Sequence, residues 1–194
     1  MNILVLVSGG GTNLQALIDA EKAGRLEPGR IVGVISDRRS AYALERAKSA
    51  GIPAMVEKAD SGLSDRLLRG AREMDAGLII LAGFLSILEG EIIRAYGGRI
   101  VNLHPSLLPK FGGAGMYGER VHQAVLAAGE TESGCTVHLV DAGTDSGPIL
   151  LQRKVPVLPT DTADSLAERI HKEEHIAIVE GTTLMVERLS ARFR

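Results

Sequence analysis

The sequence contains one cysteine, Cys135, no tryptophan and only 3% aromatic residues. A single cysteine excludes an internal disulfide and favours a reducing compartment, so we expect a cytoplasmic location. Cys135 itself is expected to pack as a small buried residue. The scarcity of aromatic side chains argues against a base-stacking surface for single-stranded nucleic acid.

Long apolar runs and an excess of charge are also missing. No run approaches the length of a membrane-spanning helix, and the apolar start of the chain is too short for a signal peptide. The net charge of −2 argues against general nucleic-acid binding, which needs a basic surface. With 194 residues, of which 45% are apolar and 24% charged, the chain is expected to form one globular domain, residues 1–194.

The stretch around which the chain is organised is residues 100–109, IVNLHPSLLP. It begins as a buried strand that is apolar except for Asn102 and His104, and Pro105 ends it. Side chains two apart along a strand share a face, so this amide and this imidazole are expected to project together at the strand's carboxyl end. Open α/β sheets bind ligands at that end. A turn-capping role for the two polar residues is the alternative.

A glycine turn, residues 8–13 (SGGGTN), follows the first expected strand, residues 2–7, and opens a helix. Free N–H groups and the helix dipole at such a turn favour an anion, and Gly11, Thr12 and Asn13 fit a single phosphate. A tight turn without a ligand is the equally simple interpretation.

A nicotinamide-dependent oxidoreductase is a rival interpretation of the same turn. The dinucleotide fingerprint needs glycine at its first, third and sixth positions, where this chain has Gly9, Gly11 and Leu14. Asp37 does end the next expected strand, residues 31–36, at the position of a ribose-binding acid. The mismatch at Leu14 weakens this alternative without removing it.

Strands and helices alternate over the first hundred residues, which predicts a doubly wound, mostly parallel α/β sheet. Helices are expected at 41–50, 64–74 and 89–96, and further strands at 53–56 and 78–81. The segment after the last of these strands either lines a pocket or belongs to the core, and it comprises Leu85, Ser86, Ile87 and Leu88.

Two strands at 136–140 and 149–157 are joined by a short loop, so we expect them to add to the sheet in antiparallel fashion. Their loop offers Asp141 and Asp145 as partners for His104.

In a second loop, residues 112–118, four of the seven residues are glycine. This loop is expected to form a lid or rim beside the site. The helix after it, 119–128, has His122 outside its apolar stripe, which predicts a surface position for this histidine.

The last segment, residues 162–189, predicts a long helix. His171, Glu174 and His175 share one of its faces and match the H-x-x-E-H pattern of inverted zinc peptidases. A solvated polar face is the plainer interpretation, and a face that closes over the phosphate end of the first helix is a third.

Taken together, these motifs resemble the phosphoribosylglycinamide formyltransferase family, the folate-dependent transferases of purine synthesis. The resemblance runs in order from Met1 to about residue 190. The Asn-x-His-Pro-Ser motif is shared by a wider superfamily that includes methionyl-tRNA formyltransferase and formyltetrahydrofolate deformylase, whose extra domains would not fit in 194 residues. The motifs that carry the resemblance are SGGGTNLQ at 8–15, LAGF at 81–84, NLHPSLLP at 102–109 and the 141–148 loop.

The resemblance implies transfer of a formyl group from 10-formyltetrahydrofolate to the amine of glycinamide ribonucleotide, with no metal and no macromolecular partner except a second copy in a homodimer. It also implies the role of each site residue. The catalytic residues would be Asn102, His104 and Asp145, with His138 in support; the ribonucleotide would bind at Gly11, Thr12, Asn13, His171 and Glu174; the folate would bind at Leu85, Ser86, Ile87, Leu88 and Asn102.

The chain departs from that family at three places. Leu85-Ser86 stands where the family often has Met-Arg, which removes any polar contact from that arginine. The 111–118 loop is longer and richer in glycine than in the best-known members. The family's folate-binding arginine has no secure counterpart, with Arg66 the nearest candidate.

Overall fold

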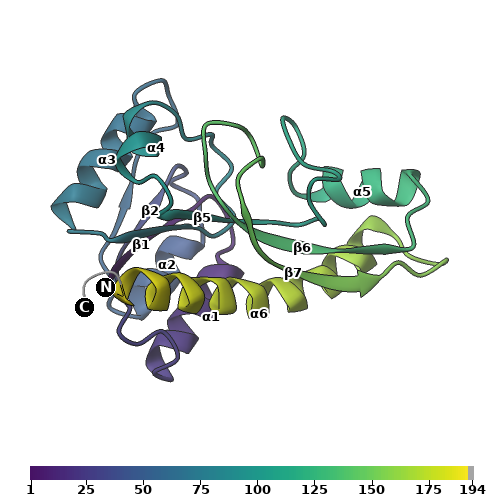
Figure 1. Ribbon diagram of the computed structural model, residues 1–194, viewed down its shortest axis with the longest axis horizontal. Coiled ribbons are helices and arrows are strands. Elements are labelled where there is room, and N and C mark those ends of the chain that lie inside the picture. The colour runs from purple at the N-terminus through teal and green to yellow at the C-terminus, as the bar shows by residue number, and fades with distance from the viewer. Residues whose placement is uncertain (192–194) are drawn as a thin grey trace.

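Residues 1–191 are described by a computed structural model whose centre is a seven-stranded sheet (Figure 1). The strands lie in the order β3-β2-β1-β4-β5-β6-β7. β1 to β5 run parallel to one another, whereas β6 pairs antiparallel with β5 and with β7. The strands are β1 (Asn2–Val7), β2 (Arg30–Ser36), β3 (Ala54–Val56), β4 (Leu78–Leu81), β5 (Ile100–His104), β6 (Glu132–Leu139) and β7 (Ile149–Pro156).

Helices cover both faces of the parallel part of the sheet, so its central strands are apolar on both sides. Alternate residues of β1 show this: Ile3, Val5 and Val7 join one apolar core, and Leu4 and Leu6 join the other. The first core contains residues of α1 (Thr12–Lys22), α2 (Ala43–Ser49), α5 (Glu119–Ala127) and α6 (Ala163–Ser190), and the second contains residues of α3 (Leu63–Glu73) and α4 (Glu91–Ala95).

The long helix α6 runs along one side of the sheet and packs against β6, β7 and α1 (Figure 1). Its start is fixed by a capping box in which Thr162 Oγ1 accepts from Ser165 N and Ser165 Oγ accepts from Thr162 N. This packing brings the middle of α6 next to the start of α1, although the two helices are far apart in the sequence. No helix in residues 1–191 is long and apolar enough to cross a membrane.

The doubly wound, mostly parallel sheet with an antiparallel addition and a long last helix is confirmed. The largest difference in bounds is at β6, which begins at Glu132, four residues before the predicted start. The segment Glu-Ser-Gly-Cys lacks an apolar alternation, but it pairs with β7 from Glu132 opposite Pro156 onward. Cys135 is fully buried within β6, as predicted, and burial raises the pKa of its thiol to about 12.

Candidate active site

The carboxyl ends of β1, β4 and β5 open onto a cavity of about 560 Å³. The chain first moves outward from β1 to β2 and β3, and then crosses back to β4 and β5 on the other side of β1. A ligand crevice forms where the winding direction reverses in this way. The cavity is closed by the glycine turn after β1, the segment after β4, the loops at 113–118 and 140–145, and the middle of α6.

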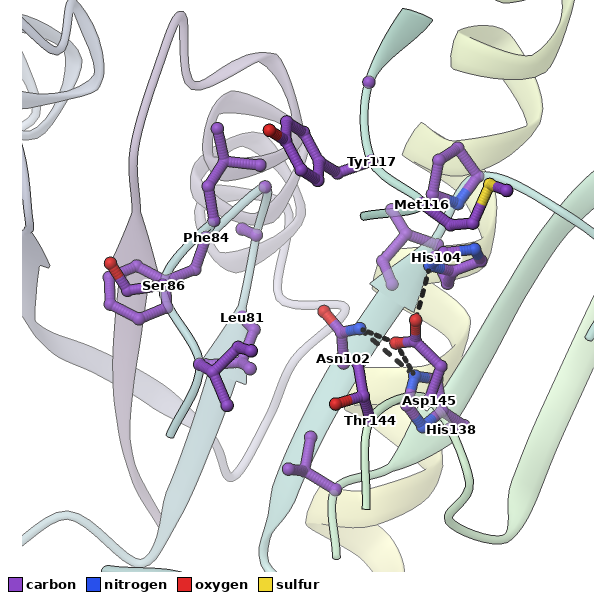
Figure 2. A pocket seen from close by; sticks show the side chains of 18 of the residues that line it. Leu81, Phe84, Ser86, Asn102, His104, Met116, Tyr117, His138, Thr144 and Asp145 are labelled. Carbon is purple, nitrogen blue, oxygen red and sulfur yellow. Dashed lines mark hydrogen bonds and ion pairs between the residues drawn. The ribbon is translucent and has the colours of Figure 1, made fainter. Parts of the chain in front are cut away.

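Strand pairing places Asn102 beside His138, its direct neighbour on the antiparallel strand β6. Asn102 Nδ2 lies 3.1 Å from His138 Nε2 and 3.4 Å from Asp145 Oδ1 (Figure 2). His138 Nδ1 is 2.9 Å from the Leu139 carbonyl oxygen, which can only accept, so Nδ1 carries a proton. Nε2 accepts from Asn102 in the neutral ring, and it lies 3.6 Å from Asp145 Oδ1, to which it can donate when the ring is protonated. The amide of Asn102 is therefore oriented, and both of its hydrogens face protein acceptors.

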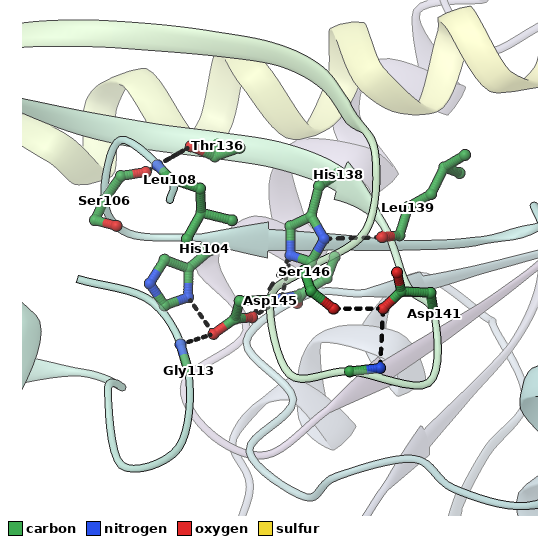
Figure 3. Close-up of polar contacts among 12 residues, drawn as sticks. His104, Ser106, Leu108, Gly113, Thr136, His138, Leu139, Asp141, Asp145 and Ser146 are labelled. Atoms are coloured by element: carbon green, nitrogen blue, oxygen red, sulfur yellow. Dashed lines mark hydrogen bonds and ion pairs between the residues drawn. The ribbon is translucent and has the colours of Figure 1, made fainter. Parts of the chain in front are cut away.

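His104 is buried at the end of β5 with an acceptor opposite each ring nitrogen. Nε2 donates to the Phe111 carbonyl oxygen at 2.8 Å, and Nδ1 lies 3.4 Å from Asp145 Oδ2 (Figure 3). Burial lowers the pKa of His104, and the charge of Asp145 and the Phe111 carbonyl oppose this effect only in part. Nδ1, with the longer contact, is the nitrogen free to exchange a proton.

Asp145 is delivered to the site by the loop between β6 and β7. Its Oδ2 accepts from Gly113 N at 3.0 Å, which ties this loop to the glycine-rich 112–118 loop. Burial alone would raise the pKa of Asp145, but the His138 and His104 rings and the Gly113 N–H together lower it. The carboxylate is thus ionised at neutral pH beside two imidazoles.

Asp141 does not reach His104 and instead shapes its own loop. Its Oδ1 accepts from Gly143 N at 3.0 Å and from Ser146 Oγ at 2.8 Å (Figure 3). Of the two acids that the sequence offered for His104, only Asp145 is in contact with it.

The glycine turn forms the opposite end of the cavity. Gly11 has a φ of 73° and is the N-cap of α1, and no side chain caps the free N–H groups of the helix. Asn13 Nδ2 donates to Glu174 Oε2 at 3.3 Å, and His171 Nε2 lies 3.9 Å from the same oxygen. The interpretation in which this face of α6 closes over the start of α1 is confirmed.

Glu174 is only 5% exposed, so the plainer alternative of a solvated polar face is wrong for this residue. Burial raises the pKa of its carboxyl, while His171 and Asn13 act in the opposite direction. A buried carboxyl that faces a cavity is suited to accept hydrogen bonds from ligand hydroxyl groups.

The third wall of the cavity is apolar and open. Leu81, Phe84 and Ser86 lie across from Asn102 in Figure 2. Leu85 is 42% exposed and Ile87 is 65% exposed, whereas Leu88 is buried. Exposed apolar side chains at a cavity mark a surface that a ligand can cover.

Asp37, the acid at the end of β2, already accepts a hydrogen bond from within the protein. Ser86 Oγ donates to Asp37 Oδ2 at 2.7 Å, and Asp37 is buried and does not line the cavity. Leu14, at the third glycine position of the dinucleotide fingerprint, is part of the core. The nicotinamide interpretation is therefore not supported.

The zinc interpretation also lacks support. Within the described residues 1–191, no three His, Cys, Asp or Glu side chains are placed so that they could hold one metal ion. His171 is largely exposed, and the Glu174 oxygen that lies 3.9 Å from its Nε2 already accepts a hydrogen bond from Asn13.

The prediction that His122 is a surface residue is wrong. Its side chain is only 3% exposed, lines the cavity, and has an Nδ1 without a hydrogen-bond partner in the described part of the chain. The sequence pattern counted it as outside the apolar stripe, but α5 turns that side toward the cavity rather than toward solvent. Burial lowers the pKa of this ring.

The model of the formyl transferase family matches residues 1–182 of this chain. The chain belongs to the formyl transferase family. It is 41% identical to phosphoribosylglycinamide formyltransferase from Escherichia coli, over 90% of this chain and 82% of that protein. It is 43% identical to the trifunctional purine biosynthetic protein adenosine-3 from Drosophila melanogaster over 203 aligned residues, and there it spans only 15% of the relative's length.

Solved structures of this family have the same fold. The crystal structure of glycinamide ribonucleotide transformylase 1 from Symbiobacterium toebii matches with a TM-score of 0.90 and 42% identity, over 96% of this chain and 88% of that one. The similarity therefore extends over nearly all of the sheet and both helical layers.

Sequence patterns did not reveal the groups that hold the catalytic segment in place, because these groups are backbone atoms or come from distant parts of the chain. Thr136 is fully buried on β6; its Oγ1 donates to the Ser106 carbonyl oxygen at 2.6 Å and accepts from Leu108 N at 3.0 Å (Figure 3). This hydroxyl fixes the segment after His104. Arg66 is paired with Glu57 and Asp60 and does not line the cavity.

Proposed function

We propose that this protein transfers the formyl group of 10-formyltetrahydrofolate to the amine of glycinamide ribonucleotide, giving formylglycinamide ribonucleotide and tetrahydrofolate. One observation supports this most directly: a single cavity joins an uncapped helix start, a buried polar centre at Asn102, His104 and Asp145, and an open apolar wall. The three parts suit a phosphate, a reacting carbonyl and a pterin ring, respectively. The names of the related proteins agree with this assignment.

In the proposed reaction the ribonucleotide's amine attacks the formyl carbon directly, and a tetrahedral intermediate with a negatively charged oxygen forms. Asn102 Nδ2 is the donor for this oxygen. The N–H that now contacts Asp145 at 3.4 Å is the one that can exchange its carboxylate partner for the charged oxygen of the intermediate. A donor placed in advance for such a charge contributes about a hundred- to a thousandfold in rate.

The intermediate breaks down when N10 of the folate leaves as an amine and takes up a proton. Protonated His104 supplies that proton from Nδ1, and Asp145 beside it favours the protonated ring. The incoming nitrogen loses a proton in the same sequence, so protons balance overall. No residue needs to form a covalent bond with the formyl group, and holding the two substrates in contact supplies much of the remaining acceleration.

The experiment is a formyl-transfer assay with glycinamide ribonucleotide and 10-formyltetrahydrofolate, followed by absorbance as tetrahydrofolate forms. Transfer that needs both substrates and continues with a chelator present supports the proposal. Loss of the formyl group without the ribonucleotide would instead indicate a hydrolase, and inhibition by the chelator would revive a metal-dependent activity.

Thr12→Asp is expected to raise the KM for the ribonucleotide strongly while the KM for the folate stays unchanged. Residue 12 is the first residue of α1, where a carboxylate is compatible with the helix dipole, so the fold should not suffer. The same carboxylate repels a phosphate bound at this turn. Steady-state kinetics with each substrate varied in turn checks this, with Thr12→Ser as the control that keeps the hydroxyl. Equal losses for both substrates would contradict the phosphate assignment.

We also propose that residues 1–194 work as one domain, in the cytoplasm, as a monomer or a homodimer. The cavity supports the first part, because its walls come from a single sheet, from the loops attached to that sheet, and from residues of α1, α5 and α6. Sedimentation at several protein concentrations distinguishes the two oligomeric states.

A further inference from the structure

Helix α2 holds the glycine turn from the side away from the cavity. Ala43 N donates to the Gly9 carbonyl oxygen at 3.1 Å, and Arg46 Nε donates to the Gly10 carbonyl oxygen at 2.8 Å. The same guanidinium donates through Nη1 to Gln15 Oε1 on α1 at 3.2 Å. One side chain of α2 therefore joins the turn to the helix that the turn begins.

The turn and α2 are in close contact at Gly11. A Cβ atom on this residue would lie 2.6 Å from Ala43 Cβ and 3.3 Å from Arg46 Cδ, and its φ of 73° already favours glycine. The guanidinium of Arg46 is in turn stacked over the Tyr42 ring, 5.1 Å from its centre. Arg46 is thus in contact with the turn on one side and with the Tyr42 ring on the other.

The Gly10 carbonyl and the Gly11 N–H belong to the same peptide unit. In a trans peptide these two groups point in opposite directions. The carbonyl faces Arg46, which does not line the cavity, so the N–H points away from Arg46, toward the cavity that Gly11 does line. No side chain caps the start of α1, so no protein side chain competes with a ligand for these N–H groups.

We propose that Arg46 is a positioning residue for the phosphate of the ribonucleotide. By holding the Gly10 carbonyl, it fixes the peptide plane that aims the Gly11 N–H at the phosphate, and its charge lies behind the turn where it favours an anion. This proposal rests on the proposed function, because it assigns a phosphate-bearing substrate to the glycine turn.

The test compares Arg46→Ala, Arg46→Lys and the control Arg94→Ala. Arg94 lies on α4 with a 73% exposed side chain that pairs with Glu91, and it does not line the cavity. We expect Arg46→Ala to raise the KM for the ribonucleotide about tenfold or more, because a misaimed N–H forfeits a hydrogen bond to a charged group. The folate KM and kcat at saturation should stay close to wild type. Arg46→Lys keeps the charge and one donor, so it should recover part of the affinity.

Binding of the ribonucleotide by calorimetry provides a second readout that needs no turnover, and thermal unfolding monitors the fold. If wild type transfers formyl groups and Arg46→Ala keeps the wild-type ribonucleotide KM, the positioning role is wrong while the function stands. A fall in kcat with both KM values unchanged would overturn the role as well. If wild type binds the ribonucleotide without transferring to it and Arg46→Ala binds it weakly, the positioning role stands while the proposed function fails.

Discussion

His104→Ala is expected to lower kcat for formyl transfer by about two to four orders of magnitude, the range of a lost general acid. His104 is 4% exposed at the end of β5, and its Nε2 is held by the Phe111 carbonyl oxygen at 2.8 Å. Nδ1, 3.4 Å from Asp145 Oδ2, is the nitrogen that can give a proton to the departing amine. The alanine variant has no group in this place to protonate it. Single-turnover rates with both substrates saturating measure the effect on chemistry alone.

A matched control must disturb the same segment without removing a titratable group. Ser106→Ala does so, since Ser106 Oγ donates to the Lys110 carbonyl oxygen at 2.7 Å and to the Phe111 carbonyl oxygen at 3.4 Å. This variant should keep kcat close to wild type. If it loses as much activity as His104→Ala, then the position of the 110–113 backbone, and not proton transfer, explains the histidine's effect. Near wild-type turnover in His104→Ala would rule out the proposed mechanism.

The fold was predictable because its signals are local. An apolar strand such as β1, a helix period after Gly11, and a short connection between β6 and β7 each depend on neighbours in the sequence. The pairing of Asn102 and His104 could be predicted for the same reason, since strand geometry alone puts residues two apart on one face. The alternation of strands and helices then predicted that Asn102 and His104 lie at the carboxyl end of the parallel strands.

What could not be predicted depends on contacts between distant segments. His122 lies outside the apolar stripe of its helix, and only the packing of α5 against α6 places it at the cavity. The choice of Asp145 over Asp141 follows from Asp145 having a φ of 55° and accepting from Gly113 N, neither of which the sequence encodes in a readable pattern. The orientation of the Asn102 amide depends on the tautomer of His138, which a backbone carbonyl decides.

Asp145→Asn is expected to lower kcat/KM at pH 7 by about a hundredfold. The carboxylate is ionised because the His138 and His104 rings and the Gly113 N–H lower its pKa against the effect of burial. Its charge in turn partly offsets the burial that lowers the pKa of His104. The amide side chain keeps the shape and an oxygen acceptor but removes that charge. The pKa of His104 should therefore fall further, and less of the acid form remains at pH 7.

The sign of this effect can be tested with a pH profile. The reaction needs protonated His104, so activity falls as the pH rises through the pKa of His104, and in the variant this fall must begin at a lower pH. The loss relative to wild type should thus shrink toward acidic pH, and taking the ratio of the two enzymes cancels the titration of the substrate's own amine. Asp141→Asn is the control, because Asp141 lies in the same loop but accepts only from Gly143 N and Ser146 Oγ, bonds that an amide oxygen can also accept. A constant ratio across the pH range would show that Asp145 does not act through the charge of His104, and its role would then be to hold Asn102 and Gly113 in place.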